Sequence, residues 1–205
     1  MQNNDLLQFE RDLYDKGIEF IAGVDEVGRG PLYGPVVCAA VILPKYYVLE
    51  GLNDSKKLSE KKREEFYDII MKDALCVNVS MRSPERIDAI NIYAATKEAM
   101  IDAIYGLELK PHHVLVDAMP LNIDVPTTSI IKGDAKSLSI AAASVIAKVT
   151  RDRMMDEIDK EFPEYGFKNH KGYPTKAHIE AIKKHGVIDG YRKSYGPVKE
   201  ILEVK

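Results

Sequence analysis

Residues 20–35 read Phe-Ile-Ala-Gly-Val-Asp-Glu-Val-Gly-Arg-Gly-Pro-Leu-Tyr-Gly-Pro, an apolar strand that runs into two acids and a Gly-Arg-Gly turn. Strand alternation predicts that Asp25 and Glu26 point to opposite faces. The glycines that follow permit a bend through which both acids serve one site, and they let a ligand approach the bare backbone. Two carboxylates beside a cation and exposed peptide groups indicate a site for a divalent metal and a phosphodiester.

Two nucleotide-binding motifs come close to this stretch but do not fit it. Gly23 and Gly28 have P-loop spacing, yet Arg29-Gly30 stands where Lys-Ser/Thr is required. The glycines at 28, 30 and 34 miss the dinucleotide fingerprint by one residue, and no helical pattern follows. The remaining alternative is an acid pair that ends a strand beside a solvated turn, and the attached Gly-Arg-Gly makes it the less favoured explanation.

Composition limits the class of protein. The 205 residues, 45% of them hydrophobic, suffice for one well-packed domain. No apolar run is long enough to span a membrane, and the first residues lack the features of a signal peptide. Cys38 and Cys76 lie in apolar segments, which favours buried free thiols over a redox pair or a zinc site. We therefore expect a cytoplasmic protein with no membrane association.

Charge is unevenly distributed along the chain. The formal net charge is −3, but Tyr165 to Lys199 holds eight Lys or Arg against two acids, a local +6 that leaves −9 for the remainder. An acidic body beside a basic C-terminal flank suits a metal-binding core next to a phosphate-contacting surface. On charge alone, a solvated helical face explains this flank about as well.

Hydrophobic periodicity predicts an α/β protein. Strands are predicted over residues 18–27, 35–43, 74–81, 113–116 and 127–131, the first two as antiparallel neighbours. Helices are predicted over 1–16, 92–107, 137–162 and, as the last one, 175–185, with further helices opened by Ser59 and Ser83. The run Ala141-Ala142-Ala143 would let the long helix pack closely on the sheet. Strands that come first and then alternate with helices imply a sheet of mixed direction.

Two further acids, Asp117 and Asp134, stand where predicted strands end. Sites assemble at strand ends in α/β sheets, so these acids can converge with the first pair. Oxygen ligands without His or Cys suit Mg²⁺ or Mn²⁺ better than zinc. The alternatives are an Asx-turn for Asp117 and an N-cap of the long helix for Asp134, which is compatible with metal binding. An ordinary solvated helix face is predicted for Asp152, Asp156 and Asp159.

A third motif, Asn-His-Lys-Gly-Tyr-Pro-Thr at 169–175, combines an aromatic ring with cations. This combination is typical of segments that stack on a sugar or base and neutralise phosphate. The alternative is a Gly-Pro loop whose tyrosine merely covers the core.

Together these segments resemble the ribonuclease HII family, the type 2 ribonucleases H, from Gly17 to about Pro197. The resemblance is carried by Asp-Glu-x-Gly-Arg-Gly at 25–30, Asn-Asp-Ser-Lys at 53–56, Val-Asp at 116–117, Lys-Gly-Asp-Ala-Lys-Ser at 132–137, Ala-Ala-Ala-Ser-Val-Ile-Ala-Lys-Val-Thr-Arg-Asp at 141–152 and His-Lys-Gly-Tyr at 170–173.

The resemblance implies a ribonuclease H-like α/β fold, a five-stranded mixed sheet flanked by helices with a helical C-terminal extension. We accordingly expect a short N-terminal helical segment (1–17), a catalytic core (18–164) and a basic helical extension (165–205), in a monomer. The implied activity is endonucleolytic hydrolysis of the RNA strand of RNA–DNA hybrids. It includes nicking on the 5′ side of ribonucleotides embedded in duplex DNA, and it leaves 5′-phosphate and 3′-hydroxyl ends.

The resemblance also assigns roles to residues. Asp25, Glu26, Asp117 and Asp134 correspond to the carboxylates that bind two Mn²⁺ or Mg²⁺ ions. The backbone of Gly28-Arg29-Gly30 corresponds to the segment that reads the ribose 2′-OH. Tyr173 matches the tyrosine that stacks on the deoxyribose after the ribonucleotide. Phosphate contacts are expected from Lys56, Ser137 and Lys171.

Two positions depart from the family pattern. Val27 replaces an alanine often seen there, and Tyr33 stands near the substrate turn where a small residue is common. The alternatives are a junction resolvase, a ribonuclease HIII-like enzyme and a catalytically silent hybrid-binding module. Gly-Arg-Gly with Tyr173 argues against the first. The short N-terminal segment, and Arg29 where that family usually has lysine, argue against the second. The complete set of acids argues against the third.

Overall fold

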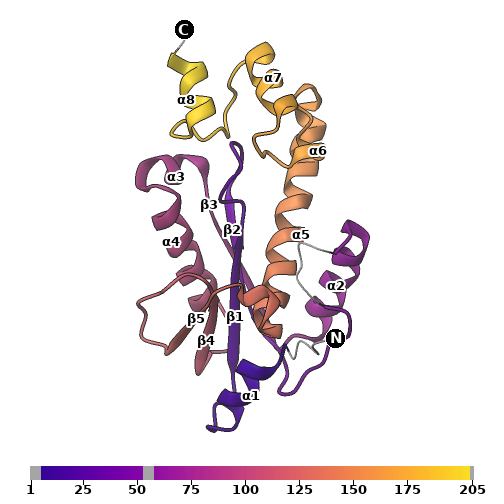
Figure 1. Ribbon diagram of the computed structural model, residues 1–205, viewed down its shortest axis with the longest axis vertical. Helices are drawn as coiled ribbons and strands as arrows, with labels where there is room; N and C mark the ends of the chain where they lie inside the picture. Colours follow the sequence, from indigo (N-terminus) through magenta and orange to yellow (C-terminus); the bar gives the residue numbers. More distant parts are fainter. Residues whose placement is uncertain (1–5, 53–57, 204–205) are drawn as a thin grey trace.

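One mixed sheet forms the centre of the molecule (Figure 1). The computed structural model describes residues 6–52 and 58–203. The five strands lie in the order β3-β2-β1-β4-β5, with β1–β2 and β2–β3 antiparallel and β1–β4 and β4–β5 parallel. They are β1 (Ile21–Val27), β2 (Val36–Ile42), β3 (Cys76–Arg82), β4 (His113–Asp117) and β5 (Thr127–Ile130). The predicted mixed sheet and its antiparallel first pair are confirmed.

Helices cover both faces of this sheet (Figure 1). Strand β2 is buried along its whole length, and its side chains alternate between the two faces. Val37 and Val41 pack toward α2 (Glu60–Asp73) and α5 (Leu138–Glu161), whereas Cys38 and Ile42 pack toward α4 (Ile92–Tyr105). The short α3 (Pro84–Ile90) precedes α4. Cys38 is a buried free thiol, as expected, but Cys76 is only half-buried. No helix among the described residues has the length and apolar character needed to cross a membrane.

The long helix α5 lies directly against β1 because both elements present small residues. Ala141 to Ala143 are fully buried, and a Cβ on Gly23 would lie 2.0 Å from the backbone carbon of Ser139. The helix is capped by Ser137, whose Oγ accepts a hydrogen bond from the N–H of Ile140. The alternative that Asp134 caps the helix is therefore wrong, and Asp134 lies just before it in the short η2 (Gly133–Ala135).

One prediction about the far part of α5 is also wrong. Asp152 is not on a solvated face: it is 6% exposed and pairs with Lys148 at 2.6 Å and with Arg63 of α2 at 3.9 Å. Asp152 follows Lys148 by one helical turn, and oppositely charged residues at that spacing are typical of a solvated helix face. The packing of α2 on α5 makes it buried.

Beyond α5 the chain forms a small second core around aromatic side chains. It contains η3 (Pro163–Tyr165), α6 (Phe167–His170), α7 (Lys176–His185) and α8 (Gly196–Glu203). The helix predicted over 175–185 is confirmed, but α8 was not predicted. Tyr33 packs against Phe167 and Tyr191, with ring centroids 4.3 and 4.9 Å away, and fills space that Gly190 leaves open. Tyr33 is therefore a core residue here and does not protrude toward a substrate.

The N-terminal helix α1 (Gln8–Tyr14) is tied to the start of α5 through Glu10. This carboxylate is 1% exposed, and its Oε1 accepts hydrogen bonds from Ser137 Oγ at 2.6 Å and from the N–H of Ser139 at 3.0 Å. Its Oε2 has no partner among the described residues. An acceptor at a helix N-terminus satisfies donors that the helix itself leaves free.

Glu10 should make stability depend on pH. Burial raises its pKa above the ordinary value, although the hydrogen bonds from Ser137 and Ser139 lower it. The contribution of the Glu10 carboxyl to the free energy of unfolding is therefore complete below the unfolded-state pKa. It is lost as the pH rises through the higher folded-state pKa. Over this pH range, the free energy of unfolding of the wild type should fall relative to that of Glu10→Gln. The fall should be about 1.4 kcal/mol for each unit by which folding raises the pKa of Glu10. Urea unfolding at several pH values measures this difference, and a difference that does not change with pH would contradict it.

Candidate active site

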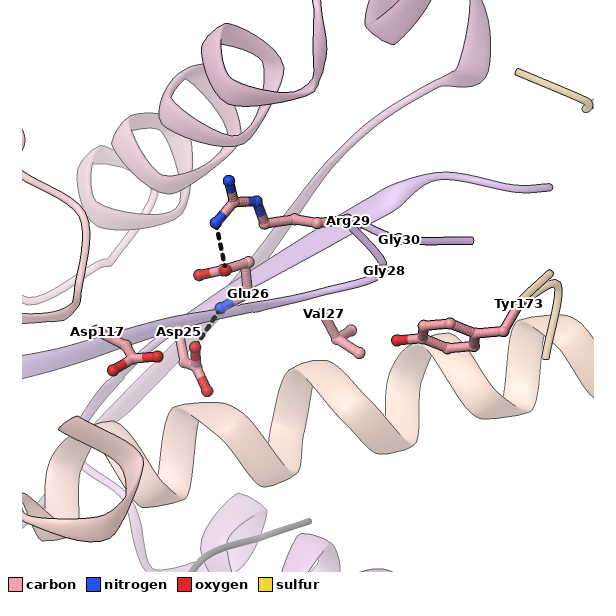
Figure 2. A pocket seen from close by; sticks show the side chains of 8 residues that line it. All are labelled: Asp25, Glu26, Val27, Gly28, Arg29, Gly30, Asp117 and Tyr173. Atoms are coloured by element: carbon pink, nitrogen blue, oxygen red, sulfur yellow. Dashed lines mark hydrogen bonds and ion pairs between the residues drawn. The ribbon is translucent and has the colours of Figure 1, made fainter. Parts of the chain in front are cut away.

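Asp25 and Glu26 are neighbours near the end of β1 and point to opposite faces of the sheet, as predicted (Figure 2). Asp25 faces α5, where its carboxylate is 3% exposed and hydrogen-bonded to Ser144. Glu26 lies on the other face and pairs with Arg29 at 3.4 Å. Both acids still belong to the β1–β2 ladder. The bend expected at the glycines follows them, at Gly28 with φ +90°.

Asp117 reaches the same place from β4, the parallel neighbour of β1. Val116 pairs with Val24, so the next residue of β4 lies beside Asp25 at the ends of the two strands. The N–H of Gly133 donates to Asp117 Oδ1 at 2.6 Å. A Cβ on Gly133 would lie 2.6 Å from Ile140 Cδ1 and 3.2 Å from Asp117 Oδ1, so a side chain here would crowd the carboxylate that the amide holds. The segment that contains Asp134 thus holds the Asp117 carboxylate in place.

A pocket of about 180 Å³ opens over these acids. The Tyr173 ring stands at its far side, 38% exposed, with Cε1 3.5 Å from the place of a Cβ on Gly30 (Figure 2). The structure therefore brings together three predicted acids, the glycine turn and the predicted stacking tyrosine. The lining residues are Asp25, Glu26, Val27, Gly28, Arg29, Gly30, Asp117 and Tyr173.

Burial and mutual repulsion shape the electrostatics of this pocket. Burial first, and then the charges of Glu26 and Asp117, raise the pKa of Asp25 well above its ordinary value, against a lowering by the Ser144 hydrogen bond. Burial also raises the pKa of the Cys38 thiol, and Glu26 and Asp25 add to this effect. Converging carboxylates in a buried site favour either a shared proton or a bound cation.

The donor set fits a hard divalent cation. All three acids offer carboxylate oxygens, the ligands that Mg²⁺ and Mn²⁺ prefer, and the pocket lining contains no His or Cys. As the side chains stand, no three Asp, Glu, His or Cys residues within 6–52 and 58–203 surround one point at metal-binding distance. The fit therefore rests on the chemistry of the donors.

The other predicted site residues lie outside this pocket lining. Asp134 is 4% exposed and belongs to η2, next to the Gly133 amide that holds Asp117. Ser137 is fully buried and bonded to Glu10 and the helix backbone, so the structure does not place it at a substrate surface. Lys171 is mostly buried and paired with Asp156. Lys56 falls outside the described residues.

Two site-supporting residues were missed. Arg151 and Arg192 are fully buried below the turn and donate to its backbone carbonyls. Arg151 lies on the same face of α5 as Ser144, seven residues earlier, and helical periodicity alone would have placed it on the buried side. For Arg192 the sequence carries no comparable signal, because it reaches the turn only through the packing of the second core.

The comparisons with known proteins agree on one family. A family model described as Ribonuclease HII matches residues 22–195. Ribonuclease HII of Bacillus cereus (strain B4264) is 59% identical over 199 residues, covering 97% of this chain and 77% of the relative. Ribonuclease HII of Bacillus cytotoxicus is 57% identical over 201 residues, covering 98% and 78%.

Solved structures extend the likeness to the fold. Ribonuclease H2 from Pyrococcus horikoshii OT3 superposes with a TM-score of 0.78 at 28% identity, covering 90% of this chain and 98% of that one. A Bst-RNase HIII structure in complex with Mn²⁺ superposes with a TM-score of 0.70 at 16% identity, covering 91% and 70%, and supports the fold alone. The chain belongs to the ribonuclease HII family and is a divalent-metal-dependent endoribonuclease.

Proposed function

We propose that this enzyme hydrolyses the RNA strand of RNA–DNA hybrids and nicks duplex DNA on the 5′ side of an embedded ribonucleotide, leaving 5′-phosphate and 3′-hydroxyl ends. The supporting observation is that one pocket joins Asp25, Glu26 and Asp117 to the Gly28–Gly30 turn and Tyr173. The acids suit the phosphodiester chemistry, whereas the turn and the ring suit recognition of the sugars on either side of the junction.

The carboxylates of Asp25, Glu26, Asp117 and Asp134 would hold two Mg²⁺ or Mn²⁺ ions. The chemistry supplied by bound ions is activation of the attacking water and neutralisation of the charge on the leaving 3′-oxygen. The chain's own contribution is to fix the donors beforehand. Ser144 holds Asp25 and the Gly133 amide holds Asp117. Donors that are held in this way leave less rearrangement for the step in which metal and substrate bind.

The Gly28–Gly30 turn offers donors for the 2′-OH. Among the described residues, the N–H groups of Arg29 and Gly30 donate to no protein acceptor, and both residues line the pocket. A ribose 2′-oxygen accepts such a bond, and a deoxyribose has nothing to offer in its place. Backbone donors here would therefore discriminate RNA from DNA at one nucleotide.

The remaining expected contacts are with phosphates. Lys171 stays a candidate on the basic segment 165–205, but its ammonium must share or leave the pairing with Asp156 to reach a phosphate. We do not retain Ser137 in this role, because its hydroxyl is buried. We propose that 165–205 supplies the outer wall of the substrate surface, since it carries Tyr173.

The test is cleavage of a DNA duplex with one embedded ribonucleotide, in Mn²⁺, in Mg²⁺ and in chelator. A nick on the 5′ side of the ribonucleotide that chelator abolishes is the expected result, and the matched all-DNA duplex should stay intact. Cleavage confined to long RNA–DNA hybrids would keep the endoribonuclease and overturn the roles assigned to the turn and to Tyr173.

Tyr173→Ala should weaken cleavage of the single-ribonucleotide duplex by roughly tenfold to a hundredfold, the effect of losing one stacking platform worth about 1–3 kcal/mol. Cleavage of long RNA–DNA hybrids should fall less, because such a hybrid offers many positions at which the enzyme can bind and cut. Steady-state kcat/KM on both substrates measures the difference. Tyr173→Phe is the matched control, since it keeps the ring. Equal losses on both substrates would argue against junction sensing.

A further inference from the structure

Two arginines are buried beneath residues 28–35, which we call the substrate turn. Arg151 of α5 and Arg192 of the segment between α7 and α8 both have 0% exposure. Within the described residues, neither forms an ion pair with a carboxylate. A guanidinium in such a place must be satisfied by other acceptors, because an unpaired buried charge is very costly. Both arginines find those acceptors in the turn's own backbone.

Arg192 binds the carbonyls at the two ends of the turn. Its Nη2 donates to Gly28 O at 2.5 Å, its Nη1 to Arg29 O at 2.9 Å and its Nε to Gly34 O at 3.0 Å. The hydroxyl of Tyr195 accepts from Arg192 Nη1 at 3.0 Å and donates to Arg29 O at 2.5 Å. The carbonyl of Arg29 thus has two donors that both come from the C-terminal segment.

Arg151 joins the turn to the loop that carries Tyr173. Its Nη2 donates to Tyr33 O at 2.9 Å and its Nε to Pro35 O at 3.1 Å. Its Nη1 donates to Lys171 O at 2.9 Å, two residues before the stacking tyrosine. The guanidinium also fills the space beside the turn, because a Cβ on Gly28 would lie 2.4 Å from Arg151 Nε.

These bonds determine where the turn's N–H groups point. The chain has no cis peptide bond among the described residues, and in a trans peptide the N–H is directed opposite to the carbonyl. With the carbonyls of Gly28 and Arg29 fixed on Arg192, the N–H groups of Arg29 and Gly30 point away from the guanidinium. In the part of the chain that the structure describes, no protein acceptor takes a bond from either of these two donors.

We propose that Arg151 and Arg192 are positioning residues for ribonucleotide recognition: they hold the substrate turn and the Tyr173 loop as one rigid unit with its N–H donors turned toward the sugar. This inference rests on the proposed function of the turn. Rigid placement allows one nucleotide step to meet the N–H donors and the aromatic ring at once.

The charge of the two arginines supports the same role. Burial, and next the proximity of Arg192, lower the pKa of Arg151 to about 10, which keeps it protonated at neutral pH. Two buried positive charges without carboxylate partners lie below a turn that must accept a phosphodiester. They favour an anion at the surface above them.

The experiment separates recognition from chemistry by measuring binding with cleavage disabled. In an Asp25→Asn background, the dissociation constants of the single-ribonucleotide duplex and of the matched all-DNA duplex give a preference ratio. Arg192→Lys keeps the charge but cannot reach the three carbonyls together, so the ratio should fall about tenfold. Tyr195→Phe removes one hydroxyl and should lower the ratio about threefold. Arg153→Lys, on α5 two residues from Arg151 but paired with Glu64, should leave it unchanged.

Each outcome bears on the inference. A fall in the ratio with unchanged affinity for all-DNA duplex supports positioning, whereas a merely structural role would weaken binding of both duplexes equally. Folded Arg192→Lys and Tyr195→Phe variants that keep the wild-type ratio would overturn it. If Arg192→Lys does not fold, Tyr195→Phe decides alone. A parent protein with no preference for the ribonucleotide would instead overturn the proposed reading of the turn, and this inference with it.

Discussion

Asp25→Asn should lower cleavage of an RNA–DNA hybrid by about a thousandfold or more, because metal-supplied charge stabilisation is worth several kcal/mol. Asp25 is the most buried of the three acids that line the pocket, and it lies between the other two, Glu26 and Asp117. An amide keeps the size of the side chain and its bond to Ser144, but it is a poor ligand for a hard cation. Affinity for the hybrid should change little, since the turn and the basic segment remain.

The same variant also distinguishes a catalytic defect from a folding defect. In chelator, Asp25→Asn should be at least as stable as wild type, because burial and neighbouring charges oppose ionisation of the native carboxyl. Urea unfolding in chelator and single-turnover cleavage in Mn²⁺ measure the two effects. Asp12→Asn, on the exposed face of α1, is the matched control and should leave both unchanged. Substantial activity in folded Asp25→Asn would refute the proposed role of this acid.

The parts of the fold that depend on local pattern were predictable. Alternation at 74–81 and the apolar run at 35–43 each predicted a strand, and the structure has β3 at the edge of the sheet with β2 next to it. The helix starts at Ser59 and Ser83 followed from residue type and position, and both side chains accept a backbone hydrogen bond in the structure. These features depend on residues that are close together in the chain, so they can be recognised in a single sequence.

Features that arise from packing between distant segments were not predictable. Asp152 is buried because α2 lies against α5, and Ser137 is used by Glu10 from 127 residues away. The helix α8 begins at Gly196-Pro197, a pair typical of turns, and its few apolar residues gave no clear period. Arg192 contacts carbonyls more than 150 residues earlier in the chain. For Asp152, Ser137 and Arg192, the polar side chain was visible in the sequence, but its partner was not.

The position of Asp25 depends on a residue that has no side chain. Gly23 and Asp25 lie on the same face of β1, two residues apart, and both face α5. The empty place at Gly23 lets the backbone at Ser139 approach the strand, and Asp25 then meets Ser144 further along the helix. The same approach brings η2 near β4, where Gly133 holds Asp117. Close packing of α5 on β1 therefore sets the spacing between the acids.

Gly23→Ala should consequently destabilise the protein by about 3 kcal/mol or more, at the upper end of overpacking costs. The new Cβ would lie 2.0 Å from Ser139 C and 2.4 Å from the nitrogen of Ile140, both backbone atoms that cannot rotate away. The gain of about 0.5–1 kcal/mol from replacing glycine in a strand is too small to offset this. Urea unfolding measures the loss.

Gly196→Ala is the control for Gly23→Ala, because a Cβ there meets nothing nearer than 4.0 Å. It should leave both stability and activity near wild type. Gly23→Ala should also lower kcat on the hybrid at temperatures where it stays folded, since a shift of α5 moves Ser144 away from Asp25. A folded Gly23→Ala variant with wild-type stability and kcat would show that α5 can retreat without moving the acids, and the link between this packing and the metal ligands would then be wrong.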